Sequence, residues 1–245
     1  MKSTCIFILF FALLITGCAE KVASVQDEPE PPPTNNQPGE NLIYFWVFDG
    51  NLANNTELEQ IDATFPENSD ARIEFVSSLD GYPNTDRRGS MERRNRPTDI
   101  NYRPNGNNNV PFADANMRGV QVRQPFEGPN GENTLIFHLP SEGFKDLLFT
   151  FASKDEDAAT SLLFDYSVTA GQATWTTTGL SQSSINQALV TDDYRLFELN
   201  LANIEDANDN PNLKVRVRFV VPDGDADNGE RVTFNNVALD GNPID

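Results

Sequence analysis

The chain has 245 residues, a formal net charge of −19 and 38% hydrophobic residues. This acidity favours solubility and repels polyanions, so the composition argues against a nucleic-acid partner. With only two cysteines the stability must come from a core, and roughly 200 residues are enough for one domain that has one.

The N-terminus has the pattern of a bacterial lipoprotein signal. Residues 6–15 are ten consecutive apolar residues after Lys2, and two small residues then precede Cys18. A membrane-spanning helix needs roughly 20 apolar residues, and an ordinary signal peptide usually ends in an Ala-x-Ala-like site, which is absent here. We therefore expect a signal peptide at residues 1–17 and a lipid on Cys18, the first residue of the mature protein.

A lipid on Cys18 would make a membrane the first partner of the protein. Two or three acyl chains, such as palmitate, bind durably, whereas one chain binds only marginally. Cys5 leaves with the signal peptide, so no disulfide forms within the mature chain. Ala19 replaces the aspartate that retains some lipoproteins at an inner membrane. We expect the protein to be anchored in the outer membrane, on either its periplasmic or its cell-surface face.

The segment after the lipidation site has the composition of a linker. Residues 18–41 lack apolar periodicity and are rich in proline and acidic residues, which predicts a disordered, extended chain. Whether it sets a spacing or acts as a simple tether is open. The folded domain is expected at residues 42–245.

Alternating apolar and polar residues predict strands through most of that domain. Leu42–Phe48 is a buried apolar run, and 213–221 alternates apolar and basic residues. In 231–239 the apolar step shifts midway, which predicts a β-bulge near Asn235 and Asn236. About ten strands without a long amphipathic helix predict an all-β, antiparallel two-sheet sandwich. Further alternating segments lie at 71–76, 119–123, 135–139, 147–151, 162–168, 173–177 and 195–199.

Four segments, taken in order, resemble a known family. They are LIFHLPSEGF at 135–144, DYSV at 165–168, NPNLKVRVRF at 210–219 and FNNVALDG at 234–241. Together they resemble the jelly-roll modules of secreted Bacteroidetes-type surface proteins, which are similar to carbohydrate-binding modules. The resemblance spans roughly 42–241 and implies a jelly-roll sandwich with a binding role. Asn235 stands where the family more often has aspartate, which puts a metal at that position in doubt.

The residue inventory gives little support to catalysis. His138 is the only histidine, and it lies in a strand pattern without a serine or cysteine nucleophile signature. A zinc site would need several His or Cys ligands. Paired carboxylates can hydrolyse glycosides, but no spacing rule selects a pair among 37 acids. We expect neither an enzyme nor a required cofactor, and a glycan-active hydrolase with dispersed carboxylates is the alternative.

An acidic loop precedes the last strand. Asp223, Asp225 and Asp227 alternate as oxygen ligands do at the start of a calcium loop. The helix-loop-helix calcium motif needs glycine at loop position six and glutamate at twelve, where Asn228 and Phe234 stand. An acidic hairpin loop is the favoured reading, and a structural calcium ion held by the three aspartates is the alternative.

The connection from Ser78 to Asn116 is too long for a plain turn, so it is either disordered or functional. Its window 86–103 holds six arginines and three acids. Arginines grip carboxylate, sulfate or phosphate bidentately, and tyrosines stack on sugars. In the other reading, the arm lies across the acidic body and neutralises it. The candidate ligand-binding residues are Arg93, Arg94, Arg96, Tyr82 and Tyr102.

These features predict a lipid-anchored, extracytoplasmic binding module without catalysis. Its expected ligand is a glycan or another component of the cell envelope, such as an envelope protein. Besides the hydrolase, a structural subunit of an outer-membrane protein assembly is an alternative, in which the arginine-rich arm docks onto an acidic partner.

Overall fold

The structure is a computed structural model that describes residues 40–83, 86–112, 116–222 and 229–244. The expected signal peptide, Cys18 and nearly all of the linker lie outside these residues, and so do the candidate calcium ligands Asp223, Asp225 and Asp227. Within the described part of the chain, no helix has the length and apolar character needed to cross a membrane.

The first sheet is built around two 13-residue strands, β9 and β14. On one edge of β14, β5 pairs with its N-terminal part and β1 with its C-terminal part. All of these pairs are antiparallel. The order is β12 (Arg195–Asn200), β9 (Phe144–Glu156), β14 (Arg231–Pro243), β5 (Gly119–Arg123) and β4 (Met91–Arg94), with β1 (Asn41–Trp46) beside β14.

The second sheet is also antiparallel and packs on the first. Short elements complete the fold: the β6 (Glu127–Gly128) and β7 (Gly131–Glu132) hairpin, the helix α1 (Gln182–Ile185), and the 3₁₀ turns Pro104–Gly106 and Glu205–Ala207. The sheet order is β11 (Asn186–Ala188), β10 (Ser161–Ser167), β13 (Lys214–Val220), β8 (Thr134–His138), β3 (Arg72–Val76) and β2 (Gln60–Asp62).

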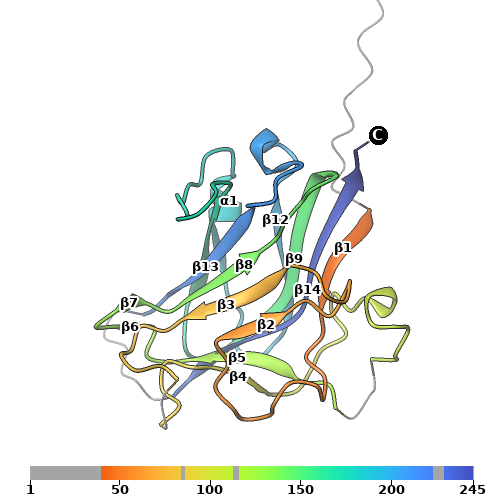
Figure 1. Ribbon diagram of the computed structural model, residues 1–245. Helices are drawn as coiled ribbons and strands as arrows, with labels where there is room; N and C mark the ends of the chain where they lie inside the picture. The colour runs from red at the N-terminus through yellow and green to blue at the C-terminus, as the bar shows by residue number, and fades with distance from the viewer. Residues whose placement is uncertain (1–39, 84–85, 113–115, 223–228, 245) are drawn as a thin grey trace, which may run out of the picture. The chain divides into compact units, whose positions relative to one another are not determined.

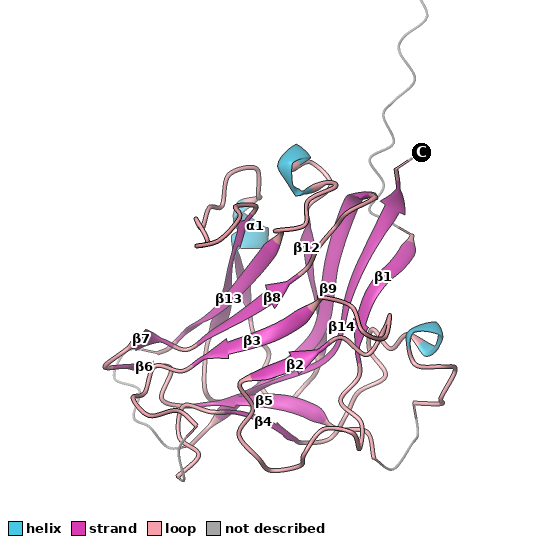
Figure 2. Ribbon diagram, in the orientation of Figure 1, coloured by secondary structure: helices cyan, strands magenta, loops and turns pink. Residues whose placement is uncertain are grey.

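The chain crosses repeatedly between the two sheets. From β8 onward, the strands β8, β10, β11 and β13 belong to the second sheet, and β9, β12 and β14 to the first. Figure 1 shows the strands of both sheets, and Figure 2 shows how little helix accompanies them. The predicted all-β, antiparallel jelly-roll sandwich is confirmed.

Phenylalanine side chains fill the space between the sheets. Phe151 on β9 lies at their centre, with its ring 5.4 Å from that of Phe197 and 5.4 Å from that of Phe234. Strand alternation places these rings inward, as it places Val215 and Val217 inward on β13. The basic residues between the valines face outward, so the pattern predicted at 213–221 is confirmed.

The strand predicted at 173–177 is wrong. Thr176 makes only an isolated bridge to Tyr166, and the rest of the segment is a loop. Its large apolar residue packs elsewhere, because the Trp175 ring lies 4.5 Å from the guanidinium carbon of Arg216 on the outward face of the second sheet. Without an apolar partner in the core, the segment gains little by joining a sheet.

The long connection from Ser78 to Asn116 contains a strand that the sequence did not predict. β4 pairs with β5 at the edge of the first sheet, although Met91 is its only apolar residue. Its other edge is covered by the segment 54–58, since the Leu58 amide donates to the carbonyl of Met91 at 2.9 Å and the Asn55 amide to that of Arg93 at 3.0 Å, so backbone hydrogen bonds on both edges hold the strand in place. The arginine-rich window therefore contains a sheet strand and is not a loop throughout.

The predicted bulge in β14 is confirmed, and it holds part of the arginine-rich window. The pairing of β14 with β9 shifts register between Asn235 and Ala238, and Asn236 has a positive φ of 48°. The buried Asn236 amide donates hydrogen bonds to the carbonyls of Thr98 at 2.7 Å and Ile100 at 2.8 Å. Residues 95–103, called the strap below, are thereby fixed to β14.

We predict that Asn236→Gly loosens the strap while the bulge persists. Glycine accepts the positive φ but loses both side-chain hydrogen bonds, so we expect a loss of about 2 kcal/mol in unfolding free energy. Urea unfolding and amide hydrogen exchange in residues 95–103 measure it. Asn55→Gly is the matched control, because Asn55 also has a positive φ but is exposed. Equal losses in both variants would contradict a clamping role for Asn236.

Candidate ligand groove

The strap crosses the outward face of the first sheet. At its start, the Asn95 amide donates to Thr233 Oγ1 at 2.6 Å and to Glu156 Oε2 at 3.3 Å. The Tyr194 hydroxyl donates to the carbonyl of Arg96 at 2.8 Å. Tyr194 lies so close to the sheet that a Cβ on Gly119 would meet its hydroxyl at 3.0 Å. These contacts fix the backbone beside a groove.

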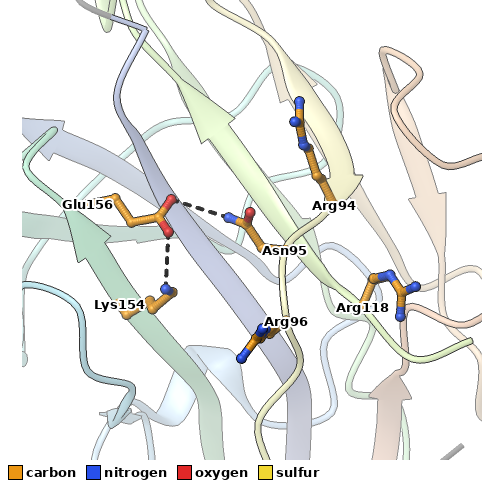
Figure 3. A pocket seen from close by; sticks show the side chains of 6 residues that line it. All are labelled: Arg94, Asn95, Arg96, Arg118, Lys154 and Glu156. Carbon is orange, nitrogen blue, oxygen red and sulfur yellow. Dashed lines mark hydrogen bonds and ion pairs between the residues drawn. The ribbon is translucent and has the colours of Figure 1, made fainter. Parts of the chain in front are cut away.

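The groove has a volume of about 660 Å³ and is open to solvent. Figure 3 shows Lys154, Glu156 and Asn95 meeting on one side, while Arg94 and Arg118 lie on the other. Its lining contains four basic side chains, one carboxylate and no aromatic ring: Arg94, Asn95, Arg96, Arg118, Lys154 and Glu156.

The charges in the groove are only partly balanced. Lys154 Nζ lies 3.1 Å from Glu156 Oε1, and Arg231 also bonds Glu156. Burial opposes ionisation of Glu156, but the hydrogen bonds from Arg231 and Lys154 outweigh it and lower its pKa. Arg94 and Arg96 are exposed, and neither makes an ion pair with any described residue.

Of the predicted arginines, Arg94 and Arg96 come together at the groove, and Arg93 does not. Successive strand residues point to opposite faces, and Arg93 turns away from its neighbour. Only 5% of Arg93 is exposed; its Nε donates to the carbonyl of Phe48 at 3.0 Å, and its guanidinium also bonds the carbonyl of Asn116. Burial lowers its pKa. Arg93 thus joins segments of the fold.

The two predicted tyrosines lie away from the groove, and both are engaged within the protein. The Tyr82 hydroxyl donates to the carbonyl of Leu58 at 2.7 Å, and its ring packs edge-on against Phe75. The Tyr102 hydroxyl donates to the carbonyl of Val110 at 2.5 Å, and its ring packs on Phe45. Each ring serves the packing of a long loop.

Sequence reasoning missed the groove residues that come from other strands. Strand alternation places Lys154 and Glu156 on the outward face of β9, and that much could be read from the sequence. Their position beside Arg94 and Arg118 depends on the order β9, β14, β5, β4, which joins segments far apart in the chain. Asn95 carried no signal, because a single asparagine in a polar stretch is ordinary.

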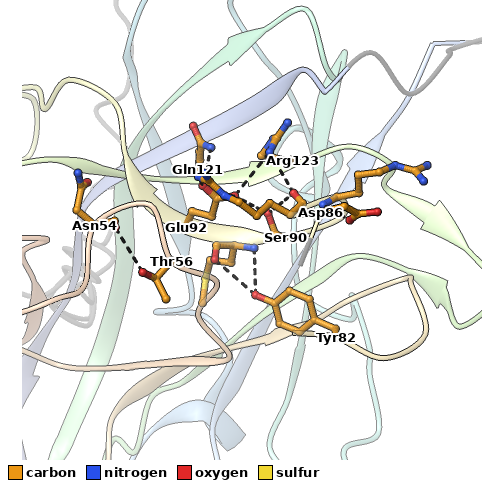
Figure 4. A network of polar contacts seen from close by, with 11 residues as sticks. Asn54, Thr56, Tyr82, Asp86, Ser90, Glu92, Gln121 and Arg123 are labelled. Atoms are coloured by element: carbon orange, nitrogen blue, oxygen red, sulfur yellow. Dashed lines mark hydrogen bonds and ion pairs between the residues drawn. The ribbon is translucent and has the colours of Figure 1, made fainter. Parts of the chain in front are cut away.

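A buried ionic network lies at the N-terminal end of the arginine-rich window, around Glu92 (Figure 4). Glu92 on β4 is fully buried, and its Oε1 accepts hydrogen bonds from Arg87 Nε at 2.9 Å and Ser90 Oγ at 3.0 Å. Arg123 Nη1 lies 3.7 Å from the same carboxylate. Burial acts to raise the pKa of Glu92, but the bonds from Arg87 and Ser90 and the charges of Arg87 and Arg123 lower it.

Two other cavities with titratable side chains in their linings are smaller than the groove. One of about 420 Å³ has three carboxylates in its lining, from Asp49, Asp62 and Glu67. Another, of about 210 Å³, includes His138, whose Nε2 lies 2.7 Å from Glu74. Burial lowers the pKa of His138 although Glu74 opposes this. In the described ranges, no cluster of three or more His, Cys, Asp or Glu side chains is placed to hold a metal ion.

Comparison with known proteins gives distant likenesses only. No protein-family model and no curated protein matches the chain. The K1 cleaved adhesin domain of Lys-gingipain from Porphyromonas gingivalis is 12% identical, with a TM-score of 0.42, over 81% of this chain and 97% of that one. The enzymatically active domain of tailspike protein 4 from bacteriophage CBA120 is 11% identical, with a TM-score of 0.40, over 71% and 20%.

TmCBM61, solved in complex with β-1,4-galactotriose, is 10% identical, with a TM-score of 0.35, over 71% of this chain and 90% of that one. At such identities and TM-scores, the likeness carries no information about a ligand or an activity. The groove must therefore be interpreted from its own residues.

The buried network predicts a pH dependence of stability. Because folding lowers the pKa of Glu92, its contribution is complete above the ordinary value of about 4.3 and is lost as the pH falls through the lower folded value. We expect Glu92→Gln to cost roughly 3 kcal/mol at pH 7, since it leaves Arg87 and Arg123 without their anion. Chemical unfolding from pH 7 to pH 3 measures the effect.

The difference in unfolding free energy between the wild type and Glu92→Gln should shrink as the pH falls below about 4.3. Glu198→Gln removes an exposed carboxylate on β12 and serves as the control. A difference that stays constant from pH 7 to pH 3 would mean that folding does not lower the pKa of Glu92.

Proposed function

We propose that the chain is a lipid-anchored, extracytoplasmic binding module that holds a glycan or another envelope component in the groove, without catalysis. The observation that carries the proposal is the pair Arg94 and Arg96, which lie exposed and unpaired with any described acid in a groove whose backbone is fixed. A fixed wall reduces the entropy lost on binding, and exposed arginines offer forked donors to a ligand.

Binding without hydrolysis fits the carboxylate content of the groove. Glycoside hydrolysis ordinarily uses two carboxyl groups on either side of the scissile bond. The described lining supplies only Glu156, and Lys154 and Arg231 hold it as an ion-paired carboxylate. A general acid needs a raised pKa, whereas that of Glu156 is lowered.

The hydrolase alternative would use the cavity of about 420 Å³ rather than the groove, because Asp49, Asp62 and Glu67 line it. The assembly alternative would use the groove, with an acidic protein in place of a glycan. Each alternative differs from the main proposal in one observable result. A hydrolase would shorten its glycan ligand, and an assembly subunit would bind its protein partner in the absence of any sugar.

The proposed anchor rests on Cys18. We predict that the wild-type chain, expressed with its signal, sediments with membranes and carries the mass of two or three acyl chains. Cys18→Ser should release nearly all of it into the soluble fraction, because lipid chains supply the membrane affinity. Cys5→Ser, which alters a residue that is removed with the signal, is the control. Membrane retention of Cys18→Ser would contradict lipid anchoring.

The binding role is tested by applying the full-length chain, purified in detergent, to a glycan array with calcium and again with a chelator. We expect a restricted set of glycans to bind, with no shortening of the bound sugars. Loss of the signal in chelator would assign calcium a part in binding and favour the aspartates at 223, 225 and 227 as its ligands. A blank array in both conditions would refute glycan binding.

A further inference from the structure

We infer, on the basis of the proposed function, that the ligand of the groove is an acidic glycan, whose sugars carry carboxylate or sulfate groups. The inference names the chemical class of ligand for this site. It depends on three properties of the groove: its charge, its size and the absence of aromatic rings from its described lining.

The first property is an excess of positive charge in an acidic protein. The chain has 37 acidic and 18 basic residues, so acids for pairing are plentiful. Arg103, for example, lies 3.2 Å from Asp240, and Arg216 lies 2.5 Å from Asp165. Arg94 and Arg96 instead face the groove with no acid among the described residues, which leaves their donors for an anion from outside.

The one carboxylate in the lining does not cancel this excess. Glu156 is shared between Lys154 and Arg231, so these three groups together keep a positive charge. Arg118 also lines the groove. A concave surface lined mostly by one sign of charge concentrates its field and attracts the opposite sign, even where the rest of the surface repels it.

The size of the groove excludes a bare inorganic ion as its full occupant. Its volume of about 660 Å³ lies in the range of 300–1,000 Å³ that is usual for larger organic ligands, whereas one water takes up about 30 Å³. The groove therefore has room for a larger molecule that carries the anionic groups. The polar lining suits one rich in hydroxyl groups.

The lining also distinguishes an acidic glycan from a nucleic acid. Proteins that hold single strands stack the bases on aromatic side chains, which contribute about 1–3 kcal/mol per base. The described lining has no aromatic ring, and the tyrosines at 82 and 102 are engaged in packing elsewhere. Recognition here depends on charge and hydrogen bonds.

The test uses the full-length chain and polymers that differ only in charge. Polygalacturonate is compared with its methyl ester, and dextran sulfate with dextran, by calorimetry and by gel retardation at two salt concentrations. We expect binding to at least one charged polymer, weaker binding to its neutral counterpart, and a decrease at higher salt. Which charged polymer binds tells carboxylate from sulfate.

Three double variants test whether the charged polymer binds in the groove. Arg94→Gln with Arg96→Gln should weaken binding about tenfold or more and leave stability nearly unchanged, because both side chains are exposed. Arg72→Gln with Lys145→Gln removes the same charge elsewhere and should change binding less than about twofold. Arg94→Lys with Arg96→Lys keeps the charge but not the fork, and should lie between the two.

Several results would overturn the inference. They are equal binding to a charged polymer and its neutral counterpart, equal binding to oligo-dT, or equal loss in the groove variant and the control variant. Binding of neutral sugars alone would overturn the acidic ligand and leave the glycan-binding proposal standing. No binding to any of these polymers, together with a blank glycan array, would overturn both.

Discussion

The change of partner along β14 is the constraint on which the rest of the structure depends. Its residues 231–234 pair with β5, and its residues from 237 onward pair with β1, while β9 lies along its other edge. The bulge at Asn235 and Asn236, where the pairing of β14 with β9 shifts register, lies between the two partners. It also leaves the Asn236 amide to hold the strap, so one local irregularity joins two strands and one wall of the groove.

Both readings of the arginine-rich window apply, but to different residues. Arg87 bonds the buried Glu92, and Arg103 bonds Asp240, so these side chains neutralise the acidic body. Arg94 and Arg96 face the groove instead. The division follows from where each residue falls on β4 or the strap. A count of charges in the window treats all of its arginines alike, so it cannot tell the arginines that pair with acids from those that face the groove.

The fold was predictable where burial alternates clearly. β13 alternates valine with lysine or arginine, and the shift of alternation in β14 located the bulge to within a residue. β4 was not predictable, because a strand with one apolar residue has no periodic signal and is defined by its partner β5. The groove was half predictable. Arg94 and Arg96 stood out in composition, but their neighbours on β9 are set by strand order, which no local pattern encodes.

The antiparallel ladder between β1 and β14 has a mechanical consequence. The backbone of Glu40 bonds Asn242, so the chain enters the sandwich beside the end of β14, and Thr233 at the groove lies nine residues earlier on that strand, or roughly 30 Å away. Tension between a ligand in the groove and the chain at Glu40 therefore acts along the strands. Ladder hydrogen bonds are perpendicular to the strands, so such a force shears the ladder as a whole and does not open its bonds one after another.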